Sequence, residues 1–273
     1  MSRSAENSPE ALDAPLERLR SRDPAAAQLL GVSAFLGDAR VPGWLVASGR
    51  DVFPDPLAAR LAGGADAAIE RARSLGREGL ASVDEDGFRL AEGVARAIRE
   101  RMSARERASF GGAAVSLLHR SFPERVGRDG DSKRVRALAP HVRAAANHPS
   151  GGGRATSEAA HTLARLAAHH REAGRLADAA EVLEQGVEVA HRGSGVEAVL
   201  RAVLLDELAG ARAGLEDREG ALEAADRALR IVHELPSGSP HRPMLLSNLA
   251  TTFREIGALD RSIDLYDRAL EAV

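Results

Sequence analysis

The sequence predicts a mainly α-helical protein with two parts: an N-terminal domain that contains one β-hairpin, and a C-terminal superhelix of α-α hairpins. Three observations support this prediction. A pattern of small and apolar residues occurs three times, at intervals of 42 and 41 residues, in the last two-fifths of the 273-residue chain. Aromatic residues make up only 3% of the chain although apolar residues make up 44%, which is typical of helices that pack through Ala and Leu. The clearest β-strand signal is at residues 80–90.

The first expected element is a helix that begins at Asp23-Pro24, because an N-cap carboxylate followed by proline favours a helix start. Residues 1–15 are polar and broken by two prolines, so we expect them to be disordered. Further helices are expected at residues 44–48 and 66–77. In the hairpin, Leu80–Val83 and Phe88–Leu90 flank a Gly-containing turn.

Two more helices are expected before the repeats. After a helix at about residues 94–102, Ser103 and Glu106 form a capping box that predicts a helix to about residue 121. A short helix at 134–147 precedes the glycine-rich residues 150–155, which predict a linker. The expected division is therefore 1–15 disordered, 16–102 N-terminal domain, 103–149 helical connector, 150–155 linker and 156–273 repeats.

The repeats predict three helical hairpins, each of which must stack on its neighbour because it cannot bury its apolar face alone. We expect Asp217 and Asp260 to cap the second helix of their hairpins. The last hairpin lacks a polar sealing helix, so we expect it to expose an apolar face. The repeated residues are Leu163, Leu166, Ala167, Gly174, Leu176, Ala179 and Leu183; Leu205, Leu208, Ala209, Arg218, Ala221, Ala225 and Ala228; and Leu246, Leu249, Ala250, Phe253, Gly257, Leu259, Ser262, Tyr266 and Ala269.

Composition and motifs argue against several classes of function. The formal charge of −3 gives no electrostatic reason to expect nucleic acid as a partner. No apolar run approaches the 18 residues of a membrane span, so we expect a cytoplasmic protein without a membrane partner. The chain has no cysteine, and no two of its nine histidines are three or four residues apart, so we expect no metal site. No nucleophile motif occurs either, and we expect neither catalysis nor a cofactor.

Three helices followed by a β-hairpin is the order of a winged helix, which can place its third helix in the major groove of DNA. Arg71, Arg73 and Arg77 lie on that predicted helix. The acidic residues Asp66, Glu70 and Glu78 accompany them, and acidic neighbours weaken phosphate contacts. DNA binding therefore stays an alternative rather than the preferred interpretation.

Six short stretches of the sequence, and the order in which they occur, resemble the region that follows the nucleotide-binding domain in bacterial signal-transducing NTPases of the NB-ARC/STAND type. They are Asp23–Ala26 with Leu29-Leu30, Ala34–Leu36, Val41-Pro42, Phe88–Leu90, Ser121–Pro123 and Leu138–Val142. The resemblance implies a winged helix, a helical connector and then long tetratricopeptide repeats. Two features depart from the family. No G-x-x-x-x-G-K-[ST] motif is present, and Ala91 replaces the histidine that senses the nucleotide.

The resemblance also implies a binding groove lined by the first helix of each repeat. Asn248 would hold a peptide backbone amide, unless it makes local helix contacts or faces solvent. Arginines in the groove would receive carboxylates of an acidic peptide, or are solvated charges. Gly210 and Gly214 each destabilise a helix by about 1 kcal/mol relative to alanine. We therefore expect a closely packed helix or a ligand backbone to occupy the space that a side chain would fill. The predicted lining residues are His161, Arg165, Arg171, Asp206, Gly210, Met244, Ser247, Asn248, Thr251 and Arg254, with Val203.

Three hypotheses for function follow. The first is a non-enzymatic interaction or sensor module that binds a protein or peptide in the repeat groove. The second is a fragment or subunit of a split ATPase regulator that works with a separate NTPase chain. The third is a DNA-binding regulator that uses the winged helix.

Overall fold

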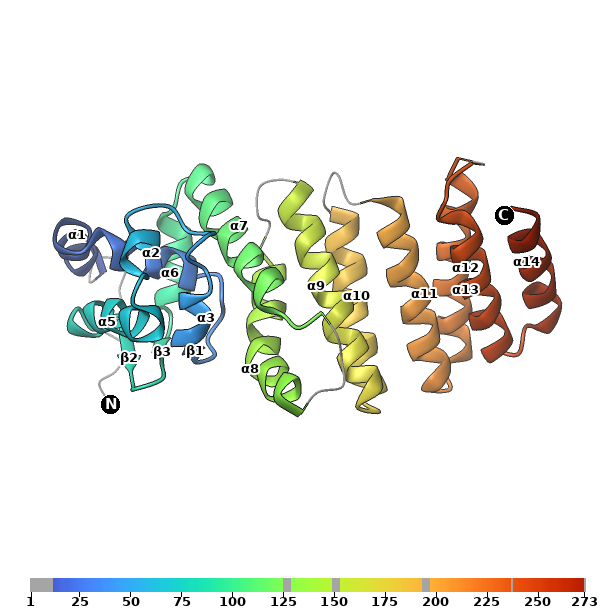
Figure 1. Cartoon of the computed structure of the whole chain (residues 1–273), viewed down its shortest axis with the longest axis horizontal. Helices are drawn as coiled ribbons and strands as arrows, with labels where there is room; N and C mark the ends of the chain where they lie inside the picture. Colours follow the sequence, from blue (N-terminus) through green and yellow to red (C-terminus); the bar gives the residue numbers. More distant parts are fainter. Residues whose placement is uncertain (1–11, 125–128, 149–152, 193–196, 237, 273) are drawn as a thin grey trace. The chain divides into compact units, whose positions relative to one another are not determined.

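The computed structural model describes residues 12–124, 129–148, 153–192, 197–236 and 238–272. The chain is mainly helical with one small antiparallel sheet, as the sequence predicts at this level (Figure 1). It divides into two compact units. The first unit comprises Met1–Phe122 with Lys133–Ala155, and the second comprises Pro123–Ser132 with Thr156–Val273.

The first unit contains seven complete helices among its described residues, together with most of an eighth. They are α1 (Asp13–Arg22), α2 (Pro24–Ser33), α3 (Gly43–Ala47), α4 (Leu57–Arg60), α5 (Gly64–Arg77), α6 (Val94–Arg101), α7 (Ala104–Ser121) and α8 (Asp129–Ala146). The predicted caps are confirmed. The Asp23 side chain accepts a hydrogen bond from the Ala26 amide at 3.1 Å, and Ser103 and Glu106 form the capping box of α7.

The sheet contains three short strands in the order β1-β3-β2, all antiparallel. The predicted hairpin is confirmed as β2 (Ala81–Val83) and β3 (Gly87–Leu90), with Val83 opposite Phe88. The third strand, β1 (Val41–Pro42), was not predicted, and it pairs Val41 with Phe88 on the other side. Arg40, directly before β1, forms an ion pair with Asp84 in the hairpin turn.

Buried and partly buried polar contacts connect distant segments of the first unit. His141 of α8 is fully buried. Its Nδ1 atom lies 2.7 Å from the Leu36 carbonyl oxygen and its Nε2 atom 3.0 Å from the Arg40 carbonyl oxygen. The hydroxyl groups of Ser48 and Ser121 are 2.8 Å apart. These contacts hold α8 and α7 against the segments that follow α2 and α3.

The structure corrects two predicted boundaries and adds one short helix. Helix α1 begins at Asp13, so Asp13–Pro15 are helical rather than disordered, because Leu16 and Leu19 are buried against the rest of the unit. The short helix α4 was not predicted. Helix α9 begins at Gly153, so 153–155 are helical rather than a linker. Residues 1–11 and 150–152 of the two predicted segments lie outside the described residues.

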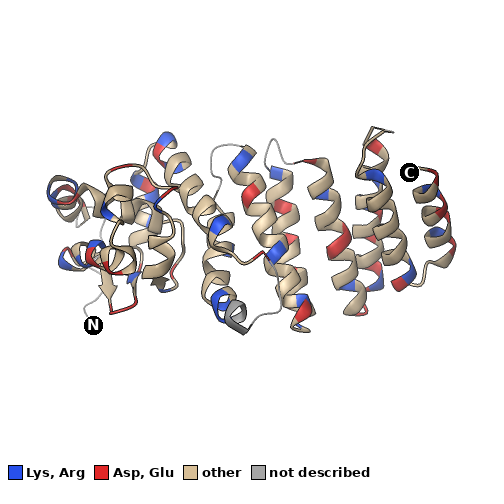
Figure 2. Cartoon of the chain, in the orientation of Figure 1, with Lys and Arg blue, Asp and Glu red and all other residues tan. Residues whose placement is uncertain are grey.

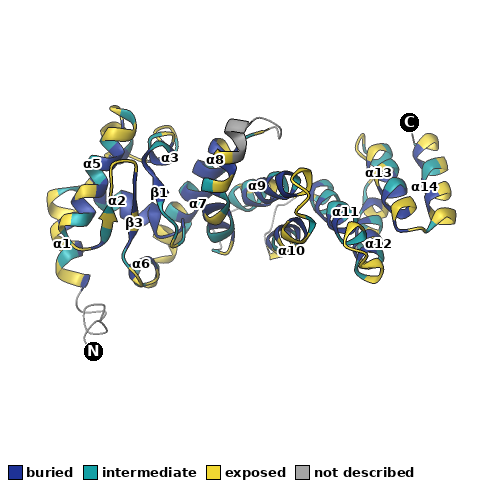
Figure 3. Cartoon of the chain, turned by 90° about the horizontal axis from the view of Figure 1, so that it is seen from below, coloured by how far each residue is buried: buried dark blue, intermediate teal, exposed yellow. Residues whose placement is uncertain are grey.

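The second unit consists of consecutive helices that pack as pairs (Figure 1). The pairs are α9 (Gly153–Glu172) with α10 (Leu176–Arg192), α11 (Ala198–Gly214) with α12 (Arg218–Glu234), and α13 (Arg242–Glu255) with α14 (Leu259–Glu271). Helices α11 and α13 also contact each other, as do α10 and α11, and α12 and α13. Each helix has buried and exposed sides (Figure 3), and the exposed apolar face expected on the last pair is Leu259, Ile263 and Leu270.

The turn inside each helix pair has a left-handed residue at the same repeat position. These residues are Gly174 (φ 71°), Glu216 (φ 62°) and Gly257 (φ 83°). Asp217 follows and caps α12 by accepting a hydrogen bond from the Gly220 amide at 3.0 Å. The predicted cap at Asp260 is wrong, because the residue equivalent to Asp217 is Ala258, and Asp260 lies within the first turn of α14.

Candidate functional site

The structure places the predicted lining residues on the first helix of each pair. His161, Arg165 and Arg171 lie on α9, Val203, Asp206 and Gly210 on α11, and the other five on α13. All eleven are exposed or partly exposed. Two contacts connect the three helices. Arg171 lies 3.6 Å from Glu207, and the Thr252 hydroxyl donates a 2.7 Å hydrogen bond to Asp206.

One residue of this surface, Glu207, was missed by the sequence analysis. The intervals of 42 and 41 residues make Arg165, Glu207 and Asn248 equivalent positions on α9, α11 and α13. The equivalence of these positions across the repeats therefore indicates Glu207, although this residue belongs to no recognisable motif. Glu207 and the eleven predicted residues together define what we call the α9–α11–α13 face.

Two neighbouring carboxyl groups on α11 are partly removed from water. Burial raises the pKa of Asp206 to about 6, although the hydrogen bond from Thr252 lowers it. Burial also raises the pKa of Glu207, against the opposing effect of the Arg171 guanidinium. Desolvation favours the neutral form of a carboxyl group. The carboxylates of this face are therefore poorly compensated within the described part of the unit, and additional hydrogen-bond donors would stabilise them.

Helix α13 presents side chains that are free to bind. Met244 is 47% exposed, and Asn248 and Arg254 are exposed. Within the described residues, neither Asn248 nor Arg254 makes a side-chain hydrogen bond or an ion pair. Thr251 is engaged instead, because its hydroxyl lies 2.8 Å from the Tyr266 hydroxyl and donates to the Ser247 carbonyl.

The two glycines of α11 have different surroundings. A Cβ atom at Gly214 would lie 2.7 Å from Leu176 of α10, so a packed side chain uses that space, as expected. A Cβ atom at Gly210 would have no neighbour within 4 Å. The space at Gly210 is open, near the C-terminal end of α11.

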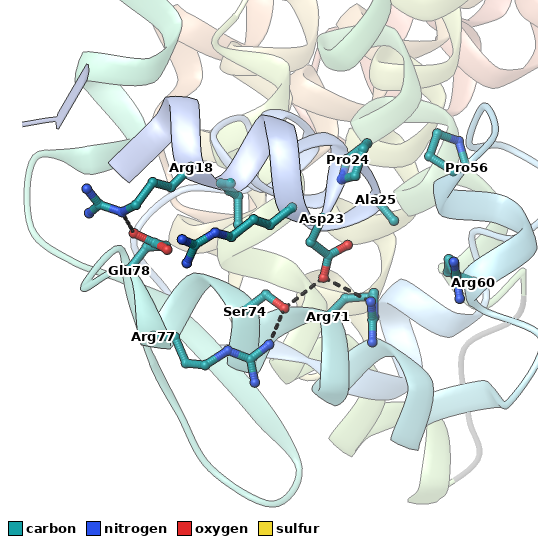
Figure 4. A pocket seen from close by; sticks show the side chains of 12 residues that line it. Arg18, Asp23, Pro24, Ala25, Pro56, Arg60, Arg71, Ser74, Arg77 and Glu78 are labelled. Carbon is teal, nitrogen blue, oxygen red and sulfur yellow. Dashed lines mark hydrogen bonds and ion pairs between the residues drawn. The ribbon is translucent and has the colours of Figure 1, made fainter. Parts of the chain in front are cut away.

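The three arginines of the possible DNA-reading helix do not act together. Arg71 of α5 lies 2.9 Å from the Asp23 carboxylate, and Arg77 donates to the Ser74 hydroxyl at 2.7 Å, which in turn donates to Asp23 (Figure 4). Arg73 pairs with Glu70 on the same helix at 3.1 Å. Two of the three are thus directed toward the N-terminus of α2 rather than outward from the helix.

No group of three or more His, Asp or Glu residues in the described ranges is arranged to hold a metal ion. None of the helices described is long and apolar enough to cross a membrane. Acidic and basic residues are interspersed along α9 to α14 (Figure 2).

Comparisons with known proteins find distant likenesses in structure. No protein-family model and no curated protein matches the chain. The crystal structure of BtubC (BKLC) from P. vanneervenii is similar with 17% identity and a TM-score of 0.44, over 99% of this chain and 91% of that one. A STAND protein with a tetratricopeptide repeat sensor from Pyrococcus horikoshii is similar with 15% identity and a TM-score of 0.30, over 99% of this chain and 47% of that one. The chain thus spans about half of the second protein's length. Likenesses this distant do not assign the chain to a family.

Proposed function

We propose that the chain is a non-enzymatic interaction module of a STAND-like signalling system, whose helix pairs act as tetratricopeptide-type repeats and bind a protein or peptide through the α9–α11–α13 face. The observation that carries this proposal is the set of unengaged groups on α13. Asn248 offers both an amide donor and an acceptor, Arg254 offers a guanidinium, and Met244 offers an adaptable apolar surface.

The dimensions of this set suit a short extended peptide. Residues 244 to 254 span about 15 Å along a helix, the length of four or five residues of extended chain. Asn248 can pair with both the N–H and the C=O of one peptide unit. Arg254 can form a bidentate pair with a carboxylate, so the proposed ligand carries an acidic residue.

The open space at Gly210 supports the same assignment. Gly210 carries no side chain, and a Cβ atom there would meet no neighbour within 4 Å. The lack of a side chain lets a ligand backbone approach α11 closely. The desolvated carboxyl groups of Asp206 and Glu207 next to this opening would accept hydrogen bonds from N–H donors of the ligand.

Selection from a displayed peptide library with the full chain tests the proposal. We expect acidic peptides to be enriched, and Asn248→Ala or Arg254→Ala to weaken their binding by about ten-fold, which corresponds to 1.4 kcal/mol. Arg230→Ala is the matched control, because Arg230 is an exposed arginine on the second helix α12. Peptides that bind all three variants equally well would contradict the proposed face. Turnover of a small molecule that a single substitution abolishes would contradict the non-enzymatic assignment.

A further inference from the structure

A cavity of about 650 Å³ in the first unit is lined by residues of α1, α2, α5 and the segment around α4 (Figure 4). Five of its lining residues are arginines, and only two are acidic. The arginines are Arg18, Arg22, Arg60, Arg71 and Arg77, and the acidic residues are Asp23 and Glu78. The lining therefore has an excess of three positive charges, in a protein whose formal net charge is −3.

Both acidic residues are already neutralised. The Asp23 carboxylate receives the Arg71 guanidinium at 2.9 Å and the Ser74 hydroxyl at 2.7 Å. The other carboxylate oxygen of Asp23 accepts a hydrogen bond from the Ala26 amide and thereby caps α2. Glu78, whose side chain is 13% exposed, pairs with Arg18 at 2.8 Å. These pairs fix the walls of the cavity and leave its carboxylates unavailable to the remaining arginines.

The other three arginines are not compensated within the cavity. The side chains of Arg22 and Arg60 are exposed and make no hydrogen bond or ion pair with any described residue. Arg77 is held in place by Ser74, and its nearest carboxylate is that of Glu70, 4.0 Å away, which also pairs with Arg73. Arg22, Arg60 and Arg77 come from three separate segments, so the fold alone brings them to one cavity.

We propose that this cavity is a binding site for a di- or triphosphate group. Guanidinium groups form bidentate hydrogen bonds with phosphate oxygens, and the excess of three positive charges in the lining matches a ligand with about three negative charges. The volume lies within the range of small-molecule sites and exceeds what a single phosphate fills. The apolar walls at Leu19, Pro24 and Pro56 can accommodate an organic part of the ligand.

Calorimetric titration of the full chain with orthophosphate, pyrophosphate and inorganic triphosphate tests this site. We expect triphosphate to bind roughly ten-fold more tightly than orthophosphate, because it contacts more guanidinium groups. ATP without magnesium forms a second arm. Tighter binding of ATP than of triphosphate assigns the site to an organic phosphate, and equal binding assigns it to the phosphate group alone.

The variant Arg22→Gln/Arg60→Gln removes two uncompensated charges from the cavity. We expect it to weaken triphosphate binding by about ten-fold or more. The matched control is Arg50→Gln/Arg105→Gln, which removes two exposed arginines of the same unit that do not line the cavity. We expect the control to change the affinity by less than about two-fold, since distant exposed charges are screened.

Three outcomes would overturn the proposal. One is equal weakening by the two double variants, which would indicate general charge attraction. Another is equal affinity for orthophosphate and triphosphate. The third is binding of a short DNA duplex that depends on Arg22 and Arg60 when triphosphate does not bind, which would indicate a nucleic-acid surface. Trp44, the only tryptophan of the chain, lies in the first unit and reports by fluorescence that each variant is folded.

Discussion

The two units are stabilised by contacts of different range. In the first unit, His141 contacts Leu36 and Arg40, which are 105 and 101 residues away in sequence. In the second unit, the Thr252–Asp206 hydrogen bond spans 46 residues and connects adjacent helix pairs. Repeats contact only their neighbours, so their stability is distributed along the array. The first unit also contains buried polar contacts, such as those of His141, that form only once distant segments meet.

The largest effect expected from this difference is that of His141→Ala in the first unit. The substitution removes a fully buried imidazole that contacts the carbonyl groups of Leu36 and Arg40, of which the neutral ring can donate a hydrogen bond to one, and it also creates a cavity. We expect the free energy of unfolding to fall by about 3–5 kcal/mol. Guanidinium denaturation followed by Trp44 fluorescence measures this loss.

The control for His141→Ala is His191→Ala, which removes an exposed histidine from α10 of the second unit. We expect that control to change stability by less than about 0.5 kcal/mol. If the two substitutions lowered the free energy of unfolding by similar amounts, the buried contacts of His141 would not contribute the expected stability to the first unit.

Local signals predicted much of the fold because they depend on a few adjacent residues. Asp23-Pro24 and the Ser103–Glu106 capping box each specify a helix start by themselves. Strand β1 could not be predicted in this way, since its two residues are extended only by pairing with β3. Helix α1 was missed because it buries only two residues, Leu16 and Leu19, within a largely charged sequence.

The same difference between local signals and long-range contacts applies to the candidate sites. The repeat period alone located the first helices, and the structure added Glu207, which the period could also have identified. Nothing in the sequence brings Arg22, Arg60 and Arg77 together, because they belong to segments whose proximity is a tertiary property. Sequence patterns thus predict sites built from repeated local units better than sites assembled from distant ones.

The second prediction is that Asp206→Asn stabilises the second unit. Burial raises the pKa of Asp206 from 3.8 to about 6, so keeping the carboxylate ionised at pH 7 costs up to about 3 kcal/mol. Asparagine keeps an oxygen that can accept the Thr252 hydrogen bond. Hydrogen exchange of α11 amides at pH 7 measures the gain, and Asp267→Asn on α14 is the control at an exposed aspartate. Slower exchange in both variants alike would contradict the role of Asp206.

The pH dependence of the two units is expected to have opposite signs. Between pH 6 and 4 the folded second unit holds a proton on Asp206 more readily than the unfolded chain does, so its stability rises as pH falls. Burial lowers the pKa of His141 below 6.5, so the unfolded chain binds that proton more readily and the stability of the first unit falls below this pH. Hydrogen exchange of α11 and of α2 across this range compares the two directly. Parallel pH profiles in both units, or a profile of α11 that Asp206→Asn leaves unchanged, would contradict this assignment. A smaller remaining dependence of the same sign is expected from Glu207, whose pKa burial also raises.

The smallest expected effect lies at the repeated turn, where the second helix pair departs from the other two. Gly174 and Gly257 adopt the left-handed conformation without steric cost, whereas Glu216 adopts it with a Cβ atom. Glu216→Gly should therefore raise the free energy of unfolding by about 1 kcal/mol, observed as slower hydrogen exchange in α11 and α12. Glu216→Ala provides the control, because alanine keeps the Cβ atom and should give no such gain. The reciprocal change Gly257→Ala should lose about 1 kcal/mol through the backbone alone, since its Cβ atom would meet no neighbour within 4 Å. A gain in Glu216→Ala equal to that in Glu216→Gly would indicate that removal of the glutamate charge, and not relief of the backbone, stabilises the turn.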